Sequence, residues 1–198
     1  QVVKARFPQA RVLRMDMDTT RTKDGYEQIL SAFSNHEADI LIGTQMIVKG
    51  HDFLNVTLVG VLAADMSLYT DDYRSGERTF QLLTQAAGRA GRGMREGEVV
   101  IQTYSPEHYA IKAAAAQDYK AFYEQEIRYR ELLGYPPAEE LMAVLAAGED
   151  ERLLETGCKY LKEYVLRIKG KAPLEVIGPA SPGVDKIKDI YRRVIYIK

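Results

Sequence analysis

The chain has 198 residues, of which 46% are hydrophobic and 28% charged, and its formal net charge is −1 at pH 7. This composition is typical of a globular protein with room for one or two domains, and it excludes a global basic field for nucleic acid. The single cysteine, Cys158, excludes a disulfide framework or a cysteine-based zinc cluster and is expected to be a small core residue. No run approaches the length of a membrane span and nothing at Gln1 resembles a signal peptide, which predicts a cytoplasmic setting.

Over the first 134 residues, short apolar runs alternate with amphipathic segments. Nearly all-apolar runs are typical of central parallel strands that are covered on both faces. Alternation of such strands with helices predicts a three-layer α/β lobe. Strands are expected at residues 11–15, 39–43, 56–63 and 99–102, and helices at residues 1–7, 24–33, 80–90 and 109–133, the last with a break at Gln117 and Asp118.

The run Gly134-Tyr135-Pro136-Pro137 stops the helical pattern and predicts a domain boundary, so that residues 1–134 form one domain and residues 135–198 another. The second domain is expected to be small and α+β. Its pattern is strand, helix, strand, strand, at residues 140–146, 149–168, 174–177 and 191–197. A split β-α-β fold would add a further helix and strand, which suggests a truncated domain whose strand 191–197 lies unpaired at an edge.

The stretch from Gln85 to Arg92 combines an amide, two arginines and two glycines. If the helix continues through it, Gln85, Arg89 and Arg92 lie at i, i+4 and i+7 and share one outward, cationic face. Guanidinium groups there offer bidentate donors to a phosphoryl group, although a solvated basic helix end fits the residues equally well. The opposite, buried stripe would hold Phe80, Leu83, Thr84 and Ala87.

This stretch resembles motif VI of superfamily 2 helicases, Q-x-x-G-R-x-G-R. Residues 42–53 resemble motif V in the form found in PriA-type primosomal replication-restart helicases, and residues 71–83 resemble that family's run into motif VI. The resemblance covers essentially the whole chain. It implies a second RecA-like helicase lobe, incomplete at its start, followed by part of a C-terminal α+β domain.

The resemblance also implies roles for the motif VI residues. Arg92 would be the arginine finger, with Arg89 beside it on the γ-phosphate and Gln85 on the same catalytic surface. Gly50 and Asp52 would lie near the nucleotide. A basic helix end with no catalytic part is the alternative for the two arginines.

Thr44 follows an expected strand, at the edge where parallel sheets present their ligand-binding loops. Its hydroxyl and backbone amide would suit a DNA phosphate. By resemblance, Thr44, Gln45 and Lys49 lie on the DNA side of the lobe. The alternative is that the Gly43-Thr44 and Lys49–Asp52 sequences are plain turns.

No G-x-x-x-x-G-K-[ST] run and no Walker B run occurs in the chain. By resemblance, ATP and Mg²⁺ are therefore expected to be bound mainly by a first lobe that is absent here. Zinc is expected in the parent protein but not in this fragment. The fragment alone is expected to lack ATPase activity. The parent would be an ATP-dependent 3′-to-5′ DNA helicase of the primosome in the bacterial cytoplasm. Its expected partners are single-stranded and forked DNA, replication-restart proteins and single-stranded-DNA-binding protein.

Near the C-terminus, basic residues alternate with tyrosines. Lys186, Lys188 and Arg192 suit phosphate contacts, and interleaved tyrosines suit stacking on bases. An ordinary exposed strand is the alternative. Two other functions stay open, a RecG-like branched-DNA helicase lobe and a DNA-binding or partner-binding module without catalytic activity. The patch as a whole consists of Lys186, Lys188, Arg192 and Arg193 beside Tyr191 and Tyr196.

Overall fold

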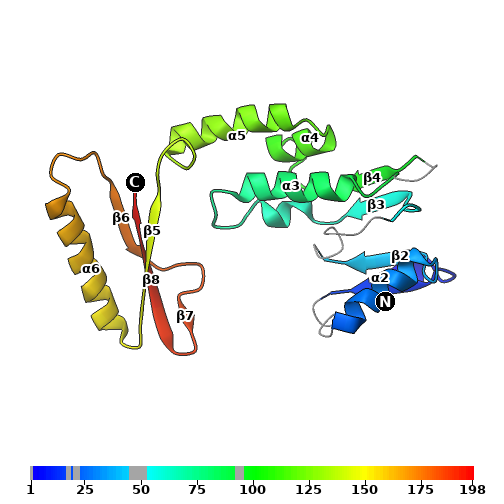
Figure 1. Ribbon diagram of the computed structural model, residues 1–198, viewed down its shortest axis with the longest axis horizontal. Coiled ribbons are helices and arrows are strands. Elements are labelled where there is room, and N and C mark those ends of the chain that lie inside the picture. Colours follow the sequence, from blue (N-terminus) through cyan, green and yellow to red (C-terminus); the bar gives the residue numbers. More distant parts are fainter. Residues whose placement is uncertain (1, 17–18, 20–22, 45–52, 92–95) are drawn as a thin grey trace. The chain divides into compact units, whose positions relative to one another are not determined.

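The computed structural model describes residues 2–16, 19, 23–44, 53–91 and 96–198. The chain divides into two compact units. Residues 1–70 and 74–122 form the first unit, and residues 71–73 and 123–198 form the second. Figure 1 shows the elements of both. The predicted boundary after Gly134 stays a prediction, because helix α5 (Tyr119–Leu133) contributes residues to both units.

The first unit begins with α1 (Val2–Arg6), β1 (Val12–Met15), α2 (Lys23–Ser34) and β2 (Ile40–Gly43). β1 and β2 pair in parallel, with Met15 opposite Gly43. Apolar residues of α2 pack against Met15, which is fully buried, and the cluster also includes Leu30 and Phe53. At the start of the pair, the Arg11 guanidinium bonds Asp39 at 2.8 Å and lowers the pKa of that carboxyl to about 2.

The rest of this unit contains β3 (Leu58–Val61), the 3₁₀ turn η2 (Ala64–Ser67), α3 (Ser75–Ala87), β4 (Glu98–Ile101) and α4 (Tyr109–Ala115). β3 and β4 pair in parallel. The expectation that the strands are covered on both faces is wrong for this pair, because exposed and half-buried residues alternate along each strand and Leu58 is 59% exposed. The core lies between α3, α4 and the start of α5, where the Phe80 and Phe122 rings stack at 4.3 Å.

The predicted break in the long helical segment is confirmed. α4 ends at Ala115, Gln117 adopts a φ of 53°, and α5 begins at Tyr119. Gly134, with a φ of 61°, follows the last residue of α5. A positive φ is costly for most side chains but not for glycine, so the chain turns at the position where the sequence predicts the stop.

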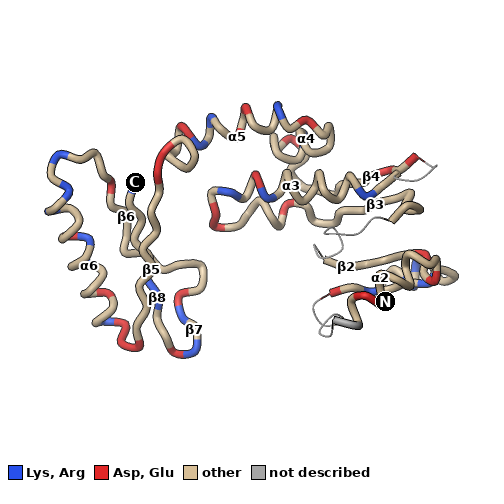
Figure 2. Tube along the Cα trace, in the orientation of Figure 1, with Lys and Arg blue, Asp and Glu red and all other residues tan. Residues whose placement is uncertain are grey.

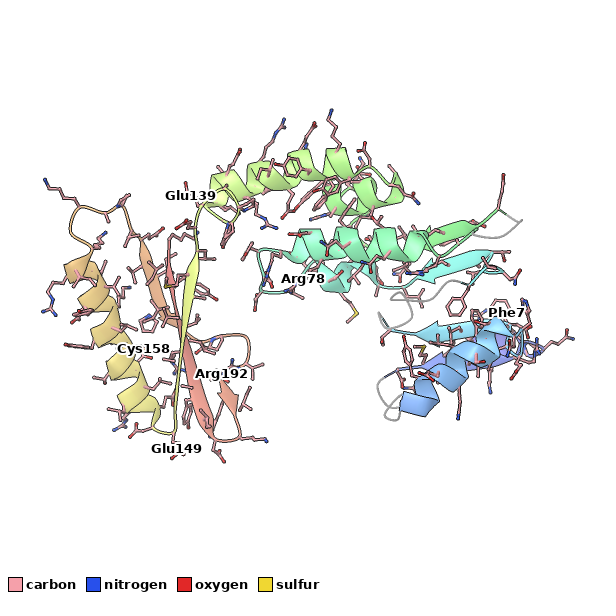
Figure 3. The ribbon with its side chains drawn as sticks, viewed as in Figure 1. Phe7, Arg78, Glu139, Glu149, Cys158 and Arg192 are labelled. Carbon is pink, nitrogen blue, oxygen red and sulfur yellow. The ribbon has the colours of Figure 1, made fainter. Side chains whose placement is uncertain are left out.

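The second unit contains β5 (Met142–Gly148), α6 (Glu151–Ile168), β6 (Val176–Ala180), β7 (Lys186–Ile187) and β8 (Ile190–Ile197). Its antiparallel strands run in the order β5-β8-β6, and β7 pairs with β8. The expected unpaired edge at residues 191–197 is therefore wrong, since β8 is the central strand. α6 packs on the sheet through Cys158, which is 3% exposed and confirms the core prediction for the cysteine (Figure 3).

The helices that the structure describes include none that is both long and apolar enough to span a membrane.

Candidate nucleotide and nucleic-acid interface

The C-terminal end of helix α3 carries Gln85, the first of the predicted motif VI residues. Its buried side holds Phe80, Leu83 and Ala87, with Thr84 half-buried, as the sequence pattern predicts. Gln85 is exposed on the other side of the helix. The outward direction predicted for Gln85 is therefore confirmed. An exposed side-chain amide at this position can donate hydrogen bonds to a bound ligand and accept them from it.

The helix ends earlier than predicted. α3 stops at Ala87, and the Gly88 amide donates to the Thr84 carbonyl at 3.0 Å. The next amide, that of Arg89, donates to Ala86 at 3.0 Å, which tightens the chain into a 3₁₀-type turn. The prediction of one continuous helical face through Gln85 and Arg89 is therefore wrong. Arg89 is half-buried and its Nε atom is buried, so this side chain does not extend fully into solvent.

Gly91 closes the turn against the strands. Its amide donates to the Val56 carbonyl at 3.0 Å, just before β3, and its φ is 72°. A Cβ on Gly91 would lie 2.7 Å from the Gly97 backbone nitrogen, and a Cβ on Gly97 would overlap Gly91 and Ala90. Gly91 therefore permits a close approach of two segments of this chain.

Two hydroxyl groups fix α3 to the turn before it. Thr79 is fully buried, and its Oγ1 lies 2.8 Å from the Ser67 Oγ and 2.8 Å from the Ser75 carbonyl oxygen. Ser67 ends η2 and donates to the Ala64 carbonyl at 3.1 Å. Because hydrogen bonds are directional, these contacts fix the rotation of α3 about its axis more closely than apolar packing alone.

Asp65, which the sequence analysis did not single out, fixes η2 in turn. Its buried carboxylate accepts hydrogen bonds from the Thr103 hydroxyl at 2.6 Å, the Tyr104 amide at 2.9 Å and the Ser105 amide at 3.1 Å. These donors, the Thr103 hydroxyl foremost, hold the pKa of Asp65 below its ordinary value. A carboxylate just after an apolar strand run is a signal that sequence reasoning had available.

Thr44 lies directly after β2 and is exposed, at the carboxyl edge of the parallel pair. This agrees with the predicted position for a ligand-binding loop. At the same edge, Asp16 follows β1 and forms two hydrogen bonds with Thr19. The Asp16 amide donates to the Thr19 hydroxyl at 2.8 Å, and the Thr19 amide donates to the Asp16 carboxylate at 3.0 Å. Asp16 also forms an ion pair with Arg14. These donors, the Thr19 amide foremost, lower the pKa of the Asp16 carboxyl.

Several predicted site residues lie outside the described part of the chain. They belong to the segments at residues 45–52 and 92–95, whose flanks are described: Phe53, after the first segment, is buried against the Phe33 ring at 5.0 Å. Their roles stay predictions. The residues concerned are Gln45, Lys49, Gly50, Asp52 and Arg92.

The C-terminal basic residues do not form one patch. Lys186 pairs with Asp189 at 2.9 Å and lies 4.6 Å from the Tyr191 ring centroid, and these partners, Asp189 first, raise the pKa of its ammonium group. Lys188 is exposed at the turn between β7 and β8, with a φ of 48°. Arg192 is half-buried on β8, next to Tyr191, and neighbouring residues of a strand face opposite sides. Because Lys186 lies opposite Tyr191 in the register of β7 on β8, Lys186 and Arg192 lie on different faces of the sheet.

Arg193 is occupied within the domain. It bonds Glu151 at 2.6 Å and Glu155 at 3.0 Å, both on α6, and only 12% of its side chain is exposed. These carboxylates, Glu151 first, raise the pKa of Arg193. Figure 2 shows acidic residues interspersed with basic ones in this part of the second unit. The predicted basic patch is thus reduced to separate cations, of which Lys186 and Lys188 are exposed.

The described residues contain no cluster of three or more histidine, cysteine, aspartate or glutamate side chains suited to a metal ion. What the first unit offers is the exposed amide of Gln85 on the last turn of α3 and the half-buried guanidinium of Arg89 just after the helix. Both side chains are hydrogen-bond donors, and the guanidinium is positively charged, so the chemistry fits an anionic group such as a phosphate. The parallel strand pairs with their helices define an α/β lobe, and its surface chemistry fits the class of a helicase lobe.

Comparison with known proteins agrees with that class. Residues 3–94 match the family of the helicase conserved C-terminal domain. The chain is 47% identical to the replication restart protein PriA of Bacillus subtilis (strain 168) over 192 residues. The matched region covers 97% of this chain and 24% of that protein. The identity is 43% over 192 residues with PriA of Synechocystis, covering 97% and 23%, and 41% over 199 residues with PriA of Chlamydia pneumoniae, covering 100% and 26%.

The chain therefore corresponds to a segment of PriA-type replication restart proteins, with a RecA-like helicase lobe followed by a small α+β domain. It spans about a quarter of the length of the curated relatives it matches.

Proposed function

We propose that this chain is the second lobe and part of the C-terminal domain of an ATP-dependent, 3′-to-5′ DNA helicase that acts in replication-fork restart. The relatives are named as replication restart proteins, and the similarity extends over 97% of the chain, well past the helicase domain that ends at residue 94. This extent favours a PriA-type helicase over a RecG-like lobe, which would share mainly motifs V and VI.

The end of α3 is the observation that carries the proposal. Gln85 is exposed on the last turn of α3, Arg89 is half-buried in the turn that follows, and the Gly91 amide bonds the Val56 carbonyl. Gln85 and Arg89 would hold the phosphates of a nucleotide bound mainly by a first lobe, with Gly50 and Asp52 near it. ATP with Mg²⁺, when bound, would supply the phosphoryl transfer to water that drives movement on DNA. Arg92 would stabilise the charge that develops on the transferred group.

On the DNA side, Thr44, Gln45 and Lys49 would contact the phosphate backbone. Thr44 is exposed at the carboxyl edge of β2, which supports its part in this contact. The proposed partners of the whole protein are single-stranded and forked DNA, replication-restart proteins and single-stranded-DNA-binding protein. Zinc would be bound elsewhere in the parent protein.

The test is DNA-stimulated ATP hydrolysis by a full-length protein that contains this segment. Arg92→Ala should lower turnover by about 10³ to 10⁵-fold, since this is the range that an arginine finger supplies, while nucleotide still binds. Arg128→Ala, which removes an exposed arginine from α5, is the matched control and should leave turnover unchanged. Unchanged turnover in Arg92→Ala would refute the finger role. The purified 198-residue chain should hydrolyse no ATP.

A second candidate function is nucleic-acid binding by the second unit, which the exposed position of Lys188 at the β7–β8 turn favours. Lys188→Ala should weaken binding to forked DNA and reduce the salt dependence of the affinity, because one phosphate contact is lost. Lys159→Ala, an exposed lysine of α6, is the control. Equal salt dependence in both variants would count against this function.

A further inference from the structure

The short segment Asp71–Tyr73 belongs to the second unit, although the residues on both sides of it belong to the first. α3 begins at Ser75, only two residues after Tyr73. The helix that carries the motif VI residues is therefore joined, at its start, to a segment that packs with the C-terminal unit.

Tyr73 is held there by a stack of rings and cations. Its ring stacks on that of Tyr135, with centroids 5.0 Å apart and planes inclined by 9°. The Arg130 guanidinium lies 4.8 Å from the Tyr73 centroid, and the Lys198 ammonium lies 4.3 Å from the Tyr135 centroid. Each ring thus has a cation over it, an arrangement that the ring quadrupole favours.

The cations of this stack are fixed by other contacts. Arg130 is 5% exposed and bonds Glu126 through Nε at 2.6 Å, and another of its nitrogens donates to the Pro136 carbonyl at 2.6 Å. The Lys198 ammonium donates to the Leu133 carbonyl at 2.8 Å. Because a buried, fully bonded guanidinium has little freedom to move, it provides a rigid surface for the Tyr73 ring.

We infer that Tyr73 is a positioning residue that couples the second unit to the arginine-bearing end of α3. An α-helix of 13 residues is a stiff rod of about 20 Å, so a displacement imposed at its start is transmitted to its end. Thr79 and Ser67 keep the rotation of the rod fixed along the way. The inference rests on the proposed function in one respect, namely that the end of α3 acts on a nucleotide.

The coupling determines how ATP hydrolysis relates to DNA unwinding. Release of Tyr73 leaves the end of α3 intact, since the backbone amides of Gly88, Arg89 and Gly91 bond to carbonyls of the first unit. Hydrolysis then continues while movement of the second unit no longer follows it. A loss of coupling would therefore be seen as a rise in the number of ATP molecules consumed per base pair unwound.

The experiment compares variants of a full-length protein that contains this segment on a forked duplex. Tyr73→Leu keeps apolar bulk but removes the ring, and it should raise the ATP consumed per base pair unwound by about fivefold or more, within the usual range of coupling effects. DNA-free ATP hydrolysis and DNA affinity should stay within about twofold of wild type by the same criterion. Tyr73→Phe, which keeps the stack, should restore the wild-type ratio.

Tyr160→Ala is the control, because it removes an exposed tyrosine from α6 in the same unit. An unchanged ratio in Tyr73→Leu overturns the inference, and so does a proportional fall of hydrolysis and unwinding, which indicates a general loss of structure. If Tyr73→Leu is unstable, Arg130→Lys keeps the charge but loses the planar contact, and the same ratio decides. A collapse of turnover in Arg92→Ala with no effect of Tyr73→Leu would leave the proposed function standing and remove only the coupling.

Discussion

The buried ion pair between Glu126 and Arg130 gives a quantitative test of the second unit. Their side chains are 10% and 6% exposed, and the carboxylate bonds two nitrogens of the guanidinium, at 2.6 Å and 2.5 Å. Glu126→Ala leaves the guanidinium buried with the Pro136 carbonyl and the Tyr73 ring but without its counter-charge. Removing one partner of a buried pair costs about 3–5 kcal/mol, so the free energy of unfolding should fall by that amount.

Urea unfolding followed by far-UV circular dichroism measures this change, because the chain contains no tryptophan for a fluorescence signal. Glu131→Ala, an exposed position on the same helix, should change the free energy of unfolding by no more than about 0.5 kcal/mol. The double variant Glu126→Leu with Arg130→Met should cost less than Glu126→Ala alone, since no unpaired charge remains. A cost below about 1 kcal/mol for Glu126→Ala would mean that water screens the pair, and the reasoning would be wrong.

Three further outcomes follow from individual contacts. Gly97→Ala should destabilise the first unit by about 1–3 kcal/mol in urea unfolding, because its Cβ meets backbone, whereas Gly60→Ala, with nothing within 4 Å, should be neutral or stabilising. Asp65→Asn should lower the free energy of unfolding at pH values above 3.8, the pKa of an unfolded aspartate. Because the pKa of Asp65 is lower in the folded protein, the difference in free energy of unfolding between variant and wild type should shrink as the pH falls through that lower value. A difference that stays constant between about pH 6 and 2 would contradict this. Asp150→Ala removes the N-cap of α6, whose carboxylate accepts from two amides, and should cost about 1 kcal/mol by hydrogen exchange of the first turn, while Glu149→Ala should not.

Most helices and strands were predictable because their signals are local. The apolar periodicity of α3 and α6, the turn at Gln117 and the stop at Gly134 each depend on residues close together in the sequence. The two-residue strand β7 was not predicted, since a strand that short has no periodicity. The position of β8 at the centre of its sheet depends on the order of pairing, which strand patterns alone do not contain.

The candidate site was predictable only in part. Gln85 follows from helix periodicity, but the end of α3 was placed too late, because Gly88 already breaks the helix and the turn that follows buries part of Arg89. The separation of Lys186 from Arg192 depends on the register of β7 on β8. The contact between Tyr73 and Arg130 joins positions far apart in the chain, and no short-range pattern predicts it.

Polar contacts hold α3 at three places along its length. Near its start, Tyr73 lies in the stack with Arg130; in the middle, Thr79 meets Ser67; and after its end, Gly91 bonds Val56. Apolar packing through Phe80 stabilises the helix but tolerates small rotations and shifts, because dispersion contacts are weakly directional. Hydrogen bonds and ring stacks tolerate much less. Substitutions at Thr79 and Gly91, whose contacts lie within the first unit, should therefore shift the end of α3 before they unfold the protein. Thr79→Val, which keeps the volume and loses the hydroxyl, should lower DNA-stimulated turnover under conditions in which urea unfolding shows that the variant is still folded.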